Sequence, residues 1–139
     1  MSVFETVVQT KIYETLTSNT ALMAAIKAVY DDVPQAVSAG DVTYFPYVSI
    51  GEDVHTDIST DLELSNLVSI TIHVWSRYAG RAETKQIQGL IYDALNRADI
   101  LDIDYKFINI HQVSSESRLD SDGFTRHGIQ TFNLMIEEL

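Results

Sequence analysis

Residues 68–95 change their hydrophobic period halfway along, and this change constrains the fold more than any other feature of the sequence. In the first half, β-branched residues alternate with polar ones, which is typical of a strand with one buried face. The apolar positions of this half are Val68, Ile70, Ile72 and Val74. In the second half, apolar residues recur at helical spacing, at Ile87, Leu90, Ile91, Ala94 and Leu95. The pattern predicts a central strand that ends at Trp75 and a helix over residues 81–97 that packs back on the sheet.

Two helices are predicted before this unit. Ser2 and Glu5 have the spacing of a capping box, which opens a helix over residues 2–17. Its buried stripe is predicted to consist of Phe4, Val8, Ile12 and Leu16. Residues 18–20 end this helix and can cap a short second helix over residues 21–28, where alanine is common and glycine absent. The inward residues of the second helix are Leu22, Met23 and Ile26.

The remaining apolar segments have the composition of strands. The strands are predicted over residues 29–33, 45–51, 62–75, 102–117 and 125–137. Residues 62–75 form either one long strand or a hairpin arm that leads into the central strand. Because residues 120–123 read Asp-Ser-Asp-Gly, a strong turn signal, the last two strands are expected to form an antiparallel hairpin. Alternation assigns Tyr105, Phe107, Asn109, His111 and Val113 to one face, Ile108 and Ile110 to the other, and Phe132, Leu134 and Ile136 to the core. The sequence therefore predicts an α+β fold, with a mostly antiparallel sheet of about four to five strands and helices packed on one face.

Composition excludes several classes of protein. The chain of 139 residues has the length of one domain, and it lacks cysteine, which excludes thiol catalysis, disulfides and cysteine zinc sites. Its formal net charge of −11 argues against specific binding of nucleic acid, since phosphate binding needs clustered Lys and Arg. No apolar run approaches the ~20 residues of a membrane span, and the N-terminus lacks the basic start of a signal peptide. We therefore expect a protein made in the cytoplasm, without a membrane partner.

Residues 52–61 contain four acids and one histidine, and they are predicted to form an exposed loop. Their spacing matches no known pattern of metal ligands, so no metal site is predicted there. Residues 120–123 likewise lack the further ligands of a calcium loop. The acids of the first segment, which are Glu52, Asp53, Asp57 and Asp61, are interpreted as an interaction surface.

The sequence contains no glycine-rich phosphate loop, nucleophile elbow or zinc-protease motif, so neither an enzymatic activity nor a cofactor is predicted. The four histidines are scattered. His73 and His111 lie on predicted strands, and their imidazoles would approach each other if those strands are neighbours; otherwise they belong to separate polar positions of one sheet. Gly89 lies inside a predicted helix at a cost of about 1 kcal/mol relative to alanine, and a close approach of helix and sheet would explain it.

Arg77 and Arg81 flank Tyr78 where the central strand meets the following helix. A cation at the N-terminus of a helix acts against the helix dipole, which suggests that these side chains have a partner elsewhere, such as a carboxylate on a neighbouring subunit. The alternative is a solvated arginine pair beside Glu83. Arg126, just after the predicted turn, poses the same two alternatives.

Five short motifs, in this order, carry a resemblance over nearly the whole chain. They are Tyr30-Asp31-Asp32-Val33-Pro34-Gln35, Phe45-Pro46-Tyr47-Val48, His73-Val74-Trp75-Ser76-Arg77, Gly80-Arg81-Ala82-Glu83 and Gly123-Phe124-Thr125-Arg126-His127-Gly128. With these motifs the chain resembles the tail-completion, or tail-terminator, family of long-tailed phages and prophages.

The resemblance implies one tail-terminator-like domain over residues 1–139 and a structural role in the virion. Such proteins assemble as a six-membered ring on the head-proximal end of the tail tube, end tube polymerisation and offer the surface that joins the head. The implied partners are further copies of the chain, the major tail tube protein and a head-connector or head-closure protein. DNA would pass through the ring without specific binding, which suits an acidic chain.

In such a ring, different patches of neighbouring subunits meet head to tail. We expect Arg77, Arg81 and Arg126 of one subunit to face the acidic segment 52–61 of the next. Two other functions stay open at this point. One is a head-closure or connector adaptor of the same particle, and the other is a small ligand-binding or enzymatic domain that uses the polar sheet face around His73 and His111.

Overall fold

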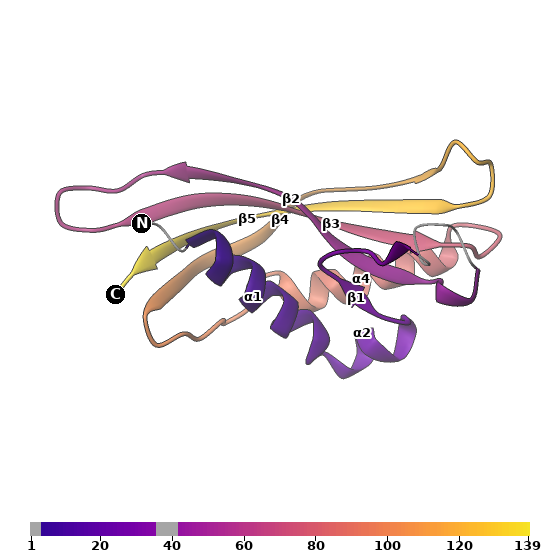
Figure 1. The fold of residues 1–139 in the computed structure, drawn as a ribbon, viewed down its shortest axis with the longest axis horizontal. Coiled ribbons are helices and arrows are strands. Elements are labelled where there is room, and N and C mark those ends of the chain that lie inside the picture. The colour runs from indigo at the N-terminus through magenta and orange to yellow at the C-terminus, as the bar shows by residue number, and fades with distance from the viewer. Residues whose placement is uncertain (1–3, 36–41) are drawn as a thin grey trace.

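A computed structural model describes residues 4–35 and 42–139 of the chain. Figure 1 shows two strand-rich ends that extend to either side of a helical layer. The elements are α1 (Phe4–Thr17), α2 (Thr20–Ala25), β1 (Val29–Tyr30), the 3-10 helix η1 (Val42–Tyr44), β2 (Tyr47–Asp57), β3 (Ser65–Ser76), α4 (Ala82–Leu95), β4 (Tyr105–Leu119) and β5 (Arg126–Glu138).

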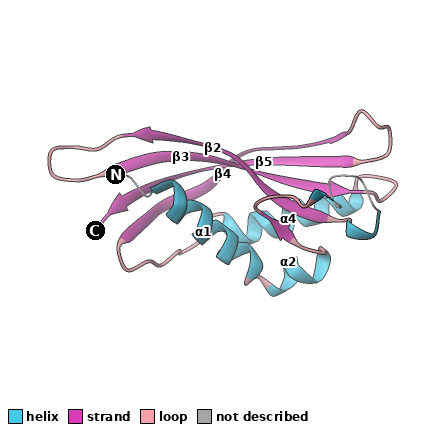
Figure 2. Cartoon of the chain, in the orientation of Figure 1, coloured by secondary structure: helices cyan, strands magenta, loops and turns pink. Residues whose placement is uncertain are grey.

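The strands form one sheet in the order β1-β2-β3-β5-β4. All neighbouring pairs are antiparallel except β1 and β2, which run parallel over two residues. The helices α1, α2 and α4 lie on the same face of the sheet (Figure 2). The prediction of an α+β fold with a mostly antiparallel sheet and helices on one face is therefore confirmed.

The core lies between the helices and the inner face of the sheet. Most residues that the two periodic patterns assigned to the interior are buried, and they come from α1, β3, α4 and β5, while Leu90 and Ala94 are partly buried against them. They include Phe4, Val8, Ile12 and Leu16; Val68, Ile70, Ile72 and Val74; Ile87, Ile91 and Leu95; and Phe132, Leu134 and Ile136. Because each large aliphatic side chain contributes about 1.5–3 kcal/mol when fully buried, this contact holds the helical layer on the sheet.

The helix boundaries follow local capping chemistry. The first helix ends at Thr17 as predicted, and Asn19 caps the second helix by accepting a hydrogen bond from the backbone N–H of Leu22 at 2.9 Å. The second helix ends at Ala25, earlier than predicted, because Ile26 adopts an extended backbone, although its side chain is still buried. Ser2, the first residue of the predicted capping box, lies outside the described residues.

The prediction that residues 52–61 form a loop is wrong for their first six residues. β2 continues to Asp57 and pairs with β3 as far as Asn66, so the acidic segment becomes one arm of a long hairpin. Its turn, residues 58–64, projects beyond the first turn of α1 (Figure 1). The polar residues of this segment form a strand because they pair with β3, which is rich in β-branched residues. The propensity of a residue for β-structure depends on such cross-strand contacts.

The predicted faces of β4 are also wrong beyond its fourth residue. The register with β5 shifts between Ile108 and His111, and Asn109 has a positive φ of 54°. This β-bulge inserts one residue and turns Ile110 to the same side as Phe107, into the core. The explanation offered for Gly89 fails as well, because a Cβ there would meet no atom within 4 Å.

Candidate functional site

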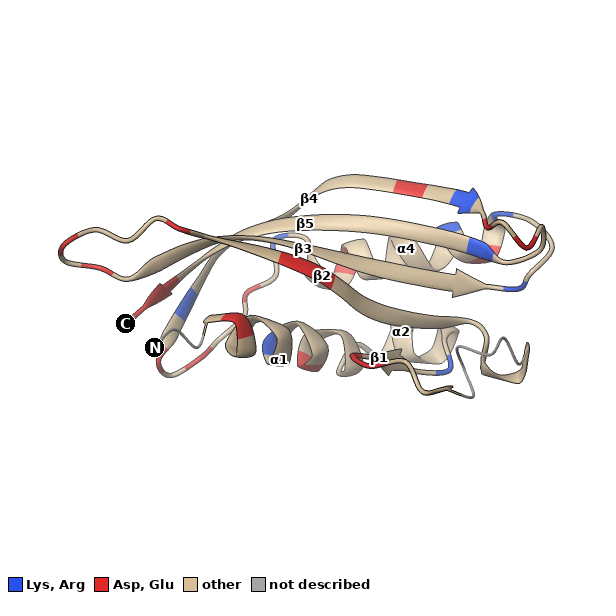
Figure 3. Cartoon of the chain, turned by 45° about the horizontal axis from the view of Figure 1, so that its top comes forward, with Lys and Arg blue, Asp and Glu red and all other residues tan. Residues whose placement is uncertain are grey.

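The residues predicted to form an interface lie at opposite ends of the sheet. Ser76, at the end of β3, pairs with Arg126 at the start of β5, so Arg77, Arg81 and Arg126 gather at one end. The tip of the acidic hairpin lies at the other end (Figure 3), whereas Glu52 and Asp53 lie midway along the sheet, opposite the middle of β3. Since β3 has 12 residues, the two ends are separated by about 35–40 Å. The basic and acidic residues therefore do not meet within one chain.

At the basic end, Arg77 is half-buried and forms several contacts within the chain. Its guanidinium carbon lies 4.5 Å from the ring centroids of both Phe45 and Phe124. Its Nε donates a hydrogen bond to Oγ1 of Thr125 at 2.7 Å. Arg77 thus joins the end of β3 to the segment before β2 and to the β4–β5 turn, through cation–π contacts and one hydrogen bond.

The other predicted residues of this end form fewer contacts within the chain. Tyr78 and Arg81 are exposed, and the buried Nε of Arg126 has no hydrogen-bond partner. Within the described part of the chain, no ion pair involves Arg81 or Arg126. Glu83, the alternative partner, instead accepts a hydrogen bond from Oγ of Ser76 at 2.6 Å.

Two of the four predicted acids bind a histidine of the same chain. Glu52 binds Nε2 of His73 at 2.8 Å, and Asp53 binds Nε2 of His55 at 2.7 Å. Asp57 is exposed, and hydrogen bonds from the side chain and the backbone N–H of Ser59 lower the pKa of its carboxyl group. Asp61 is also exposed, and Glu52 faces solvent as well although it binds His73. Asp57 and Asp61 are therefore the exposed predicted acids near the tip of the hairpin.

A chain of polar contacts crosses the helix-free face of the sheet near the basic end. Nδ1 of His73 lies 2.7 Å from Nε2 of His127, and the ring of His127 stacks on Trp75 with centroids 3.8 Å apart. Burial, followed by the nearby positive charges of His73 and Arg118, lowers the pKa of His127 to about 4. Both nitrogens of His73 already have partners, so this group is organised as a structural network rather than as a general base.

His73 and His111 do not lie on neighbouring strands, so the alternative of separate polar positions in one sheet holds. β5 lies between β3 and β4 in the sheet, so His73 meets a histidine of β5 instead. The alternating pattern placed His73 on the outer face, but the strand order that selects its neighbour is not encoded locally.

Three glutamines form a polar cluster between α4 and the sheet, which the sequence did not indicate. Nε2 of Gln130 donates to the carbonyl of Gln88 at 2.9 Å and to Oε1 of Gln112 at 2.8 Å. Nε2 of Gln88 donates to the carbonyl of Glu116 at 2.8 Å. The cluster lines an open groove of about 620 Å³, and Oε1 of Gln130 is buried there without a partner. Isolated glutamines carry no motif, so no sequence signal marks this cluster.

Chemistry beyond these contacts is limited in the described residues. Within residues 4–35 and 42–139, no group of three or more histidines and acids is arranged to hold a metal ion. None of the helices in these ranges has the length and apolar character needed to cross a membrane. The arrangement provides two chemically different surfaces at the ends of an elongated sheet.

Comparison with known proteins identifies the family. The sequence model described as "Tail completion protein gp17" matches residues 10–137. The chain belongs to this family. It is 28% identical over 116 residues to the tail completion protein gp17 of Bacillus phage SPP1, which covers 84% of this chain and 81% of that protein. As a tail-completion protein it is a structural component of the virion rather than an enzyme.

Two solved structures share the fold of this gp17 family member. A chain in the virion of a native gene transfer agent particle superposes with a TM-score of 0.81 at 25% identity, covering 93% of each chain. The structure of bacteriophage SPP1 gp17 superposes with a TM-score of 0.62 at 23% identity, covering 96% of this chain and 91% of that one. The match to a particle component indicates assembly with other tail proteins.

Proposed function

We propose that this gp17-family protein caps the head-proximal end of the tail tube. In this role it ends tube polymerisation and provides the surface to which the head is joined. Six copies form a ring, with the major tail tube protein on one side and a head-connector or head-closure protein on the other. DNA passes through the ring without specific binding, in keeping with the net charge of −11.

The observation that carries this proposal is the chemical difference between the two ends of the sheet. Rings are built from heterologous contacts, in which two different patches of the same chain meet. Exposed Tyr78 and Arg81 lie at one end and exposed Asp57 and Asp61 at the other, without ion pairs among the described residues. Such separated and complementary surfaces suit a subunit that contacts its neighbours head to tail.

The proposed subunit contact brings the basic residues of one copy to the acidic residues of the next. Arg81 and Arg126 supply the positive charges, together with Arg77, whose ring contacts hold it at this end. The acids are Glu52, Asp53, Asp57 and Asp61. Because the first two acids already bind histidines, Asp57 and Asp61 are the main partners across the contact.

Electron microscopy of particles assembled without this gene tests the role. Tail tubes of uncontrolled, excessive length beside unjoined filled heads are the expected result. Tails of normal length that fail to attach would assign the protein to the head-joining adaptor instead. Normal, infectious particles would contradict both roles.

A further inference from the structure

The acidic end of the molecule also carries an unusual number of exposed aliphatic side chains. They come from the β2–β3 turn, the loop before β4 and the C-terminus, and they are Ile58, Leu62, Leu64, Leu101, Ile103 and Leu139. Leu62, in the turn, is 95% exposed. An exposed apolar group of this kind, surrounded by acids, marks an interaction surface.

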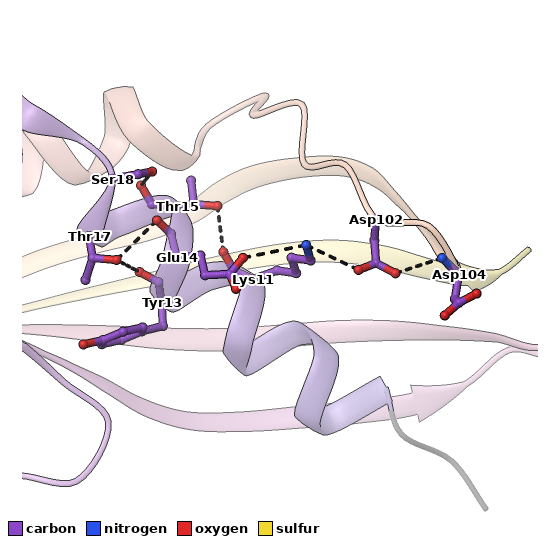
Figure 4. Close-up of polar contacts among 8 residues, drawn as sticks. All are labelled: Lys11, Tyr13, Glu14, Thr15, Thr17, Ser18, Asp102 and Asp104. Carbon is purple, nitrogen blue, oxygen red and sulfur yellow. Dashed lines mark hydrogen bonds and ion pairs between the residues drawn. The ribbon is translucent and has the colours of Figure 1, made fainter.

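These segments are held together by the chain itself. The backbone N–H of Glu138 donates to the carbonyl of Leu64, and that of Leu139 donates to the carbonyl of Asp104, both at 2.9 Å. Figure 4 shows the side chain of Lys11 on α1 reaching Asp102, with a separation of 3.3 Å. The apolar side chains are thus presented on a connected framework, which lowers the entropy lost on binding.

The basic end carries a matching apolar group. Phe124 is 56% exposed and Tyr78 is 54% exposed, and both lie beside the cluster of arginines. The acids of this end are already engaged, since Glu83 binds Ser76 and Asp122 accepts hydrogen bonds from Phe124 and Thr125. Two exposed aromatic rings therefore lie here beside Arg77, Arg81 and Arg126, and the carboxylates of Glu83 and Asp122 are held by hydrogen bonds within the chain.

From this complementarity we propose that Leu62 is the apolar anchor of the contact between copies, packing against Phe124 and Tyr78 of a second copy. This inference rests on the proposed ring and names the residues that supply its hydrophobic contact. A second copy fits the acidic end best because two chains of net charge −11 repel each other unless an acidic surface meets a basic one. Exposed ion pairs contribute at most about 1 kcal/mol each, so an apolar anchor is needed to hold the contact.

The absence of cysteine from the sequence allows a direct cross-linking test. Full-length Leu62→Cys and Phe124→Cys variants are mixed, assembled into particles and oxidised. A disulfide-linked dimer is expected only in the mixture, and the double variant is expected to give a ladder of linked copies. Leu101→Cys, an exposed leucine of the same end that is 76% exposed, is the matched control and is expected not to link to Phe124→Cys.

Other patterns of cross-links would overturn the proposal. A dimer formed by Leu62→Cys alone would show a symmetric contact, and linkage of Leu62→Cys to the tube protein or the head protein would assign the anchor to a different partner. Absence of any mixed dimer in assembled particles would also contradict it. In all three cases the phenotype of the gene deletion still tests the capping role separately.

A substitution gives a second, independent readout. Leu62→Asp is expected to lower self-association about tenfold or more without changing the melting temperature, because the side chain is exposed in the single copy. Leu101→Asp adds the same charge at the same end and is expected to leave association within about twofold of the natural chain. Equal effects of the two variants would contradict a specific anchor.

Discussion

The imidazoles of His73 and His127 are in hydrogen-bond contact across the two central strands, with Nδ1 and Nε2 separated by 2.7 Å. The second nitrogen of His73 binds Glu52, so one continuous chain of contacts joins β2, β3 and β5. His127 is only 7% exposed and stacks on Trp75. This network stiffens the sheet next to the basic end, and it makes the stability of the fold depend on pH.

Acidification is expected to destabilise the protein through His127. Its pKa is lowered from 6.5 to about 4 in the folded chain, so the unfolded chain binds a proton first as the pH falls. Stability is therefore lost as the pH falls from about 6.5 to about 4, by up to about 3 kcal/mol from this residue. Urea unfolding at a series of pH values measures the loss.

His127→Gln is the control for this titration, since it keeps a polar side chain that does not bind protons in this range. Carboxyl groups remote from His127 titrate alike in both proteins, so their effect cancels in the comparison, and only Glu52, whose pKa His127 helps to lower, is changed with it. The variant is expected to be less stable at pH 7 and to lose less stability at acid pH. The same slope in both proteins would exclude His127 as the origin of the pH dependence.

Gly51→Ala is expected to disrupt the same network. A Cβ at this position would lie 2.5 Å from ring atoms of His73, so the imidazole has to move away from Glu52. Overpacking of this kind costs about 1–3 kcal/mol, measured by thermal or urea unfolding.

Gly89→Ala is the matched control for this substitution. A Cβ there meets nothing within 4 Å, and alanine favours the interior of α4, so this variant is expected to gain about 0.5–1 kcal/mol. Destabilisation by both substitutions to a similar extent would argue against the steric explanation for Gly51.

Arg77→Ala is expected to lower the free energy of unfolding by about 1–2 kcal/mol, because it removes two cation–π contacts and one hydrogen bond. Arg81→Ala removes the same charge from an exposed position that forms no ion pair with the described residues, and it is expected to change stability by at most about 0.5 kcal/mol. Differential scanning calorimetry of both variants measures the difference. Equal melting temperatures of the two variants would show that the contacts of Arg77 do not stabilise the basic end.

Charge reversal tests the proposed ionic contact between copies. Arg81→Glu and Asp61→Arg are each expected to reduce ring formation several-fold, because each places like charges across the contact. The double variant restores opposite charges and is expected to recover much of the loss. Ring formation is measured by sedimentation and by counting capped tails in micrographs. Additive losses in the double variant would show that the two residues do not meet.

Several features of this protein could be predicted from the sequence because they depend on neighbours in the chain. The alternation from Val68 to Val74 and the four-residue steps from Phe4 to Leu16 each define a buried face within one element. The fold class follows from the types and order of these elements. The motifs around the basic end led to the correct family, which the comparison established.

Other features were decided by tertiary structure. The positive φ of Asn109 turns Ile110 into the core, and pairing with β3 makes a strand of the acidic residues that end at Asp57. The position of β5 beside β3 gives His73 its partner. Likewise, only the folded sheet separates Arg81 and Asp61 to opposite ends of one molecule. Periodicity specifies which face of an element is buried, whereas register, bulges and strand order arise from contacts between residues far apart in the chain.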